Sequence, residues 1–204
     1  MPPGSARRRP PEVVPDLSSR SLAVAPALLG CVLRVRGVGV RLTEVEAYEG
    51  ADDPASHAWR GPTARNAVMF GPAGRLYVYT MHGHACVNIV CGPDGIASAV
   101  LLRAGELVEG IEVARERRPG VRDAWLARGP GNLTRALGIT RDDNGAVLDA
   151  ASGVTLTSPI GERGEVRAGV RVNVSRAFDR PWRFTLDHPS VSALTLHPAA
   201  RATH

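Results

Sequence analysis

The stretch from Val38 to Tyr48 reads Val-Gly-Val-Arg-Leu-Thr-Glu-Val-Glu-Ala-Tyr and has the alternation of a β-strand. Its even-numbered positions begin apolar and end in Glu44, Glu46 and Tyr48. Because successive side chains of a strand point to opposite faces, these three polar side chains share the apolar face. A carboxylate buried there without partners would cost several kcal/mol. The end of this strand is therefore predicted to form the floor of a cleft.

Further strands and helices are predicted on both sides of this strand. Strands 76–81 and 85–91 are joined by a turn containing Gly83 and form a long hairpin with a histidine on either side of its tip. Other strands are expected at 31–35, 96–103, 153–156, 170–174 and 182–186. Helices are expected after Asp16, at 106–118, after Asp123 and at 133–137 with Asn132 as cap. Because strands and helices are segregated along the chain, we expect an α+β fold with a mainly antiparallel sheet.

The composition is that of a globular protein. Hydrophobic residues make up 44% and charged residues 22% of the 204 positions, which suffices for one core. We expect a single domain at 16–196, a disordered Arg/Pro-rich segment at 1–15 and a flexible tail at 197–204. The odd number of cysteines, three, favours a reducing cytoplasm over a disulfide framework. No apolar run approaches the roughly 20 residues of a membrane span, so no membrane association is predicted.

The charge of the chain favours a polyanionic partner. The net charge is +5, and the chain contains no lysine, so no lysine amine is available for Schiff-base chemistry. Between Asp53 and Asp94 there is no acidic residue, whereas Arg60, Arg65 and Arg75 fall in that window. Such a window suits a polyanion. A buried hairpin would also lack acidic residues, so both interpretations stay open.

Glu46 is a candidate general base, because a partly desolvated carboxylate at a strand end can activate a water molecule. The chain has only three tyrosines, Tyr48, Tyr77 and Tyr79, and all of them lie in two short segments near loops. With His57 they are candidates for a slot that stacks a flat ring, and a cationic ring would gain about 0.5 to 2 kcal/mol of further attraction. An ion-paired edge glutamate and tyrosines at the edge of a core are the alternative interpretation.

The histidines allow two other interpretations. His82 and His84 could form half of a metal site completed by Glu44, Glu46 or His57, since imidazole and carboxylate suit zinc or iron. No established spacing of metal ligands supports that site. The competing role for His82 is a wedge that enters a base stack from the tip of the hairpin.

Two segments could bind a phosphate. Arg103 ends an otherwise apolar strand, so its guanidinium can emerge at the sheet edge and hold a phosphate or a carboxylate bidentately. The segment 129–132, Gly-Pro-Gly-Asn, precedes a predicted helix and offers free backbone donors. A plain helix cap is the simpler interpretation of that segment.

Several short motifs of this chain, taken together in their order and spacing, are specific enough to indicate a protein family. They are Leu28 to Gly30, Thr43 to Tyr48, Ala55 to His57, Thr63 to Phe70, Gly74 to Tyr79, Cys86 to Ile89, Val100 to Ala104, Gly129 to Leu133, Arg171 to Val174 and Pro181 to Phe184. In these motifs the chain resembles the alkyladenine DNA glycosylase family, also called 3-methyladenine DNA glycosylase.

The resemblance implies a single mixed domain, built on a curved antiparallel sheet with a protruding β-hairpin, that flips a damaged nucleotide out of duplex DNA and hydrolyses its glycosidic bond. It implies alkylated purines as substrates, with deaminated purines left open, and an abasic product without strand cleavage. No metal or other cofactor is implied. The expected partner is double-stranded DNA with damaged purines, bound in the bacterial cytoplasm, at the nucleoid, by a monomer with no obligate protein partner.

The resemblance also assigns roles to ten residues. These are Glu46 as the base that activates the water, Arg103 and the carbonyl of Val174 as groups that hold the water and the flanking phosphate, Tyr48, His57, Tyr79 and Asn88 as the base pocket, and Arg65, Met69 and His82 as DNA contacts. Three positions depart from the usual pattern. His82 stands where a tyrosine or another bulky side chain is usual, Asn132 where lysine is common and Asn173 where glycine is common. Two rival functions stay open, a non-catalytic damaged-DNA binding module and a metal-dependent hydrolase.

Overall fold

The computed structural model describes residues 14–201 of the chain. The predicted disordered segment 1–15 lies almost wholly outside the described residues, and so do the last three positions of the predicted tail 197–204. Within that tail a short helix, α4 (Pro198–Arg201), is formed. The division of the chain into these segments stays a prediction.

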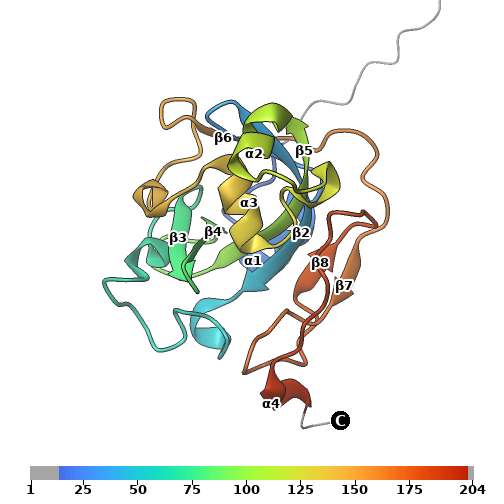
Figure 1. The fold of residues 1–204 in the computed structure, drawn as a ribbon. Coiled ribbons are helices and arrows are strands. Elements are labelled where there is room, and N and C mark those ends of the chain that lie inside the picture. Colours follow the sequence, from blue (N-terminus) through green and yellow to red (C-terminus); the bar gives the residue numbers. More distant parts are fainter. Residues whose placement is uncertain (1–13, 202–204) are drawn as a thin grey trace, which may run out of the picture.

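The main element of the molecule is one antiparallel sheet, which is strongly curved (Figure 1). Its six main strands lie in the order β3-β4-β5-β2-β1-β6, and β8 pairs with both β2 and β7. The strands are β1 (Val32–Val35), β2 (Val38–Tyr48), β3 (Leu76–Met81), β4 (His84–Val90), β5 (Ala99–Glu109), β6 (Val154–Thr157), β7 (Arg167–Gly169) and β8 (Arg183–Thr185). The other helices are α1 (Ser21–Leu28), α2 (Ile111–Arg117) and α3 (Pro130–Leu137). The predicted α+β class with a curved, antiparallel sheet is confirmed.

Strand β2 is the central element. Along one edge it pairs with β5 over nearly its whole length, while along the other it pairs first with β1, up to Arg41, and then with β8, from Glu44 to Glu46. Register shifts between β2 and β5 fall around Leu42 and Glu44. Such bulges increase the local twist and bend a strand. The second half of β2 is thus enclosed between two strands, and its side chains from Thr43 to Ala47 are buried on both faces.

The core has two parts. The larger one joins the apolar face of the sheet to α1 and α3, through residues such as Leu28, Leu102 and Leu137, all fully buried. The smaller one lies beside β3 and β4 and contains Met69, Tyr77 and Tyr79, among others. Packing of the first part stabilises the sheet, and the second part forms one side of the cavity described below.

Strands β3 and β4 pair from Leu76 with Ile89 to Met81 with His84, so His82 and Gly83 form a two-residue turn. Both residues have positive φ, 48° and 78°. Positive φ at both central positions is the geometry of a type I′ turn, whose twist matches that of the two strands. That this pair of strands protrudes from the domain stays a prediction.

Several predicted elements differ from the structure. The strand expected at 96–103 runs from Ala99 to Glu109. The helix expected at 106–118 begins only at Ile111, because β5 continues to Glu109 and Gly110 reverses the chain at φ 65°. The helix expected from Leu133 with Asn132 as cap begins at Pro130, a favoured first position because its missing N–H would be unpaired there anyway. The strand expected at 170–174 is absent: β7 ends at Gly169, and the following residues form turns.

Candidate active site

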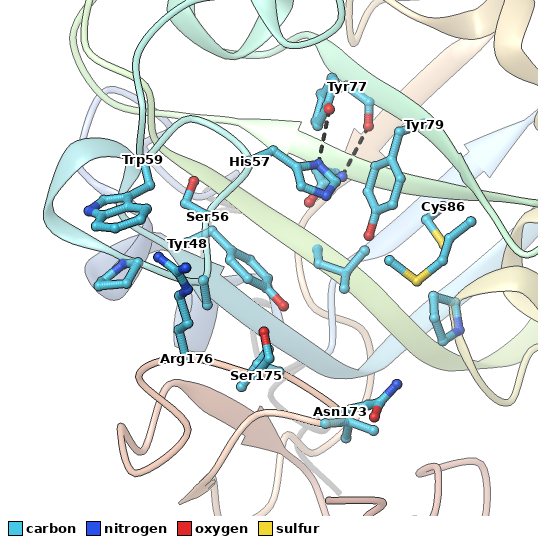
Figure 2. Close-up of a pocket in the computed structure, with 18 of the residues that line it drawn as sticks. Tyr48, Ser56, His57, Trp59, Tyr77, Tyr79, Cys86, Asn173, Ser175 and Arg176 are labelled. Atoms are coloured by element: carbon cyan, nitrogen blue, oxygen red, sulfur yellow. Dashed lines mark hydrogen bonds between the residues drawn. The ribbon is translucent and has the colours of Figure 1, made fainter. Parts of the chain in front are cut away.

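A cavity of about 730 Å³ opens between the sheet and two loops, around residues 54–60 and 172–176 (Figure 2). Pockets for small organic groups have volumes of roughly 300–1,000 Å³. Aromatic side chains form much of the wall. They are Tyr48 from the end of β2, Tyr77 and Tyr79 from β3, and His57 and Trp59 from the first loop.

Glu46 lies directly behind the wall of this cavity and is fully buried. Its Oε1 accepts a hydrogen bond from the backbone N–H of Val172 at 2.7 Å, and its Oε2 accepts one from the Tyr48 hydroxyl at 3.0 Å. The guanidinium of Arg103 lies 3.4 Å from Oε2. Val172, Tyr48 and Arg103 all line the cavity. The carboxylate is therefore fixed in orientation by groups that themselves face the cavity.

Arg103 is held by a second carboxylate, Glu44, whose Oε1 accepts from the Arg103 Nε at 2.8 Å. The same oxygen accepts from the Nε of Arg183 at 2.8 Å, and the backbone N–H of Ser192 donates to Oε2 at 2.7 Å. Burial alone would raise the pKa of Glu44, but the charges of Arg103 and Arg183 outweigh it and lower that pKa. Glu44 is thus an ionised anchor that positions Arg103 beside Glu46.

Tyr48 is supported from behind by Arg171. The guanidinium carbon of Arg171 lies 4.6 Å from the centre of the Tyr48 ring, and Arg171 binds Asp53 with two hydrogen bonds of 2.5 and 2.8 Å. Arg171 and Asp53 are buried, at 1% and 0% exposure. Burial and the negative charge of Glu46 raise the pKa of Tyr48, so its hydroxyl keeps its proton and donates to Glu46.

His57, Tyr77 and Tyr79 form an aromatic cluster across the cavity from Arg176 (Figure 2). The His57 ring meets Tyr79 edge to face, with centroids 4.5 Å apart, and the two tyrosine rings are stacked at 5.6 Å. The Tyr77 hydroxyl lies 3.1 Å from His57 Nδ1. Partial burial and the charge of Arg65 lower the pKa of His57, while burial raises that of Tyr77. At neutral pH both groups are therefore uncharged, and the tautomer of His57 decides which of them donates the hydrogen bond.

The remaining residues proposed for the site are placed as follows. Asn88 and Met69 are buried and line the cavity, and Asn88 donates to the Tyr77 carbonyl at 3.1 Å. Val174 also lines the cavity, but the group of that loop that contacts Glu46 is the backbone N–H of Val172. The roles of all these residues stay predictions.

Arg65 and His82 lie outside the cavity lining. The guanidinium of Arg65 lies 5.9 Å from the Tyr79 ring, so this residue borders the aromatic cluster. His82 is exposed at the turn between β3 and β4. Within residues 14–201 no three His, Cys, Asp or Glu side chains come together as a set of metal ligands, so the alternative half-site of His82 and His84 is not completed there.

Several site residues were not predicted individually. Asp53 and Arg171 are 118 positions apart, and nothing in either local sequence indicates that they meet. Trp59, Arg60 and Arg176 line the cavity as well. The absence of acidic residues between Asp53 and Asp94 was the sequence signal that pointed to Arg60. Among the described residues, no helix is long and apolar enough to cross a membrane.

A cavity walled by aromatic rings and backed by a fixed, buried carboxylate suits a hydrolase that acts on a flat ring compound. The family model described as methylpurine-DNA glycosylase (MPG) matches residues 16–190. The chain belongs to this family, so it is a DNA glycosylase, a hydrolase acting on the N-glycosidic bond. The family resemblance predicted from the sequence is confirmed.

Bacterial relatives match nearly all of the chain. A protein of Cutibacterium acnes is 49% identical over 185 residues, which are 87% of this chain and 97% of the relative. A protein of Nocardia farcinica is 55% identical over 187 residues, 86% of this chain and 88% of the relative. A protein of Mycobacterium leprae is 52% identical over 190 residues, which are 89% of this chain and 88% of the relative. Each of the three carries 3-methyladenine DNA glycosylase in its name.

Proposed function

We propose that this protein excises alkylated purines from double-stranded DNA, using a water molecule activated by Glu46. The observation that carries the proposal is that all three groups contacting the Glu46 carboxylate also line the cavity. A carboxylate has about four lone-pair sites, and one of those on Oε1 is taken by the N–H of Val172. A water at the cavity wall can donate to a remaining site and lose its proton to Glu46 as it attacks.

The flipped base is held between Tyr48 and the cluster of His57 and Tyr79. Extrusion is required because the atoms of the glycosidic bond are inaccessible in a stacked duplex. Figure 2 shows these rings around one space, with Tyr48 on one side and the other two across from it. A cationic alkylated ring placed there gains attraction from the faces of the aromatic side chains. Asn88 contributes a polar group to the same wall.

Alkylation at a ring nitrogen makes the purine a good leaving group, so the enzyme chiefly has to stabilise the positive charge that develops on the sugar and to deliver water. The buried negative charge of Glu46 stabilises that sugar, and a preorganised charge acts strongly where solvent is excluded. Arg103 holds Glu46 in place through its Oε2. The same site accepts deaminated purines only if binding compensates for their poorer leaving groups.

The product of this reaction is an abasic site in an intact strand. Strand cleavage by this class of enzyme needs an amine that forms a Schiff base with the sugar, and the chain contains no lysine. The net charge of +5 and the arginines near the cavity support duplex DNA as the partner, bound by a monomer at the bacterial nucleoid.

The test is a panel of duplex oligonucleotides that carry 3-methyladenine, hypoxanthine or 1,N6-ethenoadenine. Incubation with the protein should produce alkali-labile abasic sites on at least the alkylated duplexes, without strand breaks before alkali treatment. Binding to the lesions with no release of any base would instead establish a non-catalytic damage-binding module and refute the proposal. Breaks before alkali treatment would refute the monofunctional mechanism alone.

A further inference from the structure

Trp59 lies at the rim of the cavity and holds two arginines that come from different loops. The guanidinium carbon of Arg176 lies 4.7 Å from the centre of the indole ring, and that of Arg60 lies 5.6 Å from it. All three residues line the cavity, and Trp59 is 36% exposed. Figure 2 shows Trp59 and Arg176 together on the side of the cavity away from Tyr77 and Tyr79.

Neither arginine has an acidic partner among residues 14–201. Other arginines near the cavity are engaged, Arg103 with Glu44 and Arg171 with Asp53. Two guanidinium groups against one ring, without a nearby carboxylate, repel each other and attract an anion. The indole contributes cation–π attraction to both, so it holds their planar donor groups in place.

Both loops are fixed from within. The buried side-chain amide of Asn66 donates to the carbonyls of His57 and Gly61, at 2.9 and 3.1 Å, and so closes the loop that presents Trp59 and Arg60. In the other loop, the carbonyl next to Arg176, that of Ala177, lies 3.4 Å from the buried guanidinium of Arg171. Buried side chains therefore hold both loops in their present shape, and a preorganised site loses less entropy on binding.

We propose that Arg60 and Arg176, held by Trp59, form a phosphate-binding site for a phosphodiester of the strand that carries the flipped nucleotide. This inference rests on the proposed function, since it assigns a ligand to the rim of the same cavity. The indole acts as the support of the two guanidinium groups. Each arginine offers parallel N–H donors that match two phosphate oxygens.

The experiment measures the dissociation constant of a short duplex that contains a tetrahydrofuran abasic-site analogue, at several salt concentrations. This duplex has no base to release, so the result is independent of any failure of the proposed chemistry. Each phosphate contact contributes roughly 0.9 to the slope of log K against log salt. Because both arginines bind the same phosphate, the double variant Arg60→Ala, Arg176→Ala should flatten the slope by about that amount, and each single variant by part of it. Trp59→Ala should raise the dissociation constant on the order of threefold, and Trp59→Phe less.

Arg122→Ala is the matched control. Arg122 packs 3.7 Å from the ring centre of Trp125, which is 39% exposed and lies outside the cavity lining, so the variant removes the same charge from a similar pair elsewhere. Its slope should equal that of the wild type. A wild-type slope in Arg60→Ala and Arg176→Ala would overturn the proposal, and so would an equal flattening in Arg122→Ala.

Discussion

The guanidinium of Arg171 lies 4.6 Å from the centre of the Tyr48 ring, and the hydroxyl of that ring donates to Glu46. Arg171 also donates to the Ala47 carbonyl at 3.0 Å and is paired with Asp53. A buried ion pair is thus packed against the tyrosine that joins the cavity to the Glu46 carboxylate. Its contribution is to the position of Tyr48, because Arg171 does not itself line the cavity.

Replacing Arg171 by methionine should destabilise the fold by about 3–5 kcal/mol, because Asp53 would remain buried as an unpaired charge. Unfolding in urea at neutral pH measures the change. Arg115→Met is the control, since Arg115 binds Asp123 with a similar two-bond geometry on the exposed surface, where such pairs contribute little. Equal effects of the two substitutions would contradict a structural role for the buried pair. The double variant Asp53→Asn, Arg171→Met should recover part of the loss.

Replacing Glu44 by glutamine should lower kcat on the order of 100-fold while KM changes little. The reason is that Arg103 loses its charged partner Glu44 and no longer keeps its position next to Glu46. Steady-state kinetics on a lesion duplex separates the two parameters. Glu106→Gln is the control, since Glu106 pairs with Arg41 away from the cavity. A rise in KM alone would show that Glu44 serves DNA binding instead.

Glu44 also predicts how stability depends on pH. Its pKa in the folded protein lies below the ordinary value of 4.5, so the unfolded chain takes up a proton first as the solution is acidified. The stabilisation from Glu44 is therefore present above pH 4.5 and is lost as the pH falls through the folded-state pKa. Urea unfolding between pH 6 and pH 3 should show a shallower acid-side decline in Glu44→Gln than in the wild type. Parallel curves would contradict this assignment.

The lowered pKa of His57 predicts a pH-dependent choice between lesions. Below its ordinary value of 6.5 the ring eventually becomes charged and repels a cationic base, whereas a neutral base is affected less. Rates of excision of 3-methyladenine relative to 1,N6-ethenoadenine should fall as the pH is lowered from 8 to 5. The ratio should be nearly constant in His57→Gln. A wild-type ratio that does not change with pH would show that His57 does not become charged beside the base in this pH range.

Asn173 stands where glycine is common in the family, and its backbone conformation accounts for this. Its φ of 55° lies in the left-handed region, which glycine adopts without strain and asparagine tolerates. Asn173→Gly should keep the fold and, because the side chain lines the cavity, should change the relative rates on small and bulky lesions. Asn173→Ala should destabilise by about 1–2 kcal/mol. Unchanged relative rates in Asn173→Gly would remove the side chain from the specificity determinants.

Much of the frame was predictable, because it depends on local patterns. The strand from Val38 to Tyr48 and the paired strands around Gly83 follow from alternation and turn residues. Alternation also placed Glu46 on a buried face, although both faces of β2 are buried there. The tyrosines of the cavity could be named because the chain has only three of them.

The parts that could not be predicted depend on contacts between distant segments. Asp53 meets Arg171 across 118 positions, and Ser192 reaches Glu44 across 148. The segment 170–174 has the apolar alternation of a strand, but the chain turns there, so that the side chain of Arg171 enters the core and the N–H of Val172 points to Glu46. Tertiary hydrogen bonds outweigh the local strand preference in this segment.

The most direct test of the central claim is the single-turnover rate of base release by Glu46→Gln. Glutamine keeps the shape of the side chain and can still accept hydrogen bonds, but it cannot take a proton from water. The rate on a 3-methyladenine or 1,N6-ethenoadenine duplex should fall by at least about 100-fold, while the dissociation constant for the same duplex stays close to that of the wild type. Release at the wild-type rate would contradict the assignment of Glu46 as the general base.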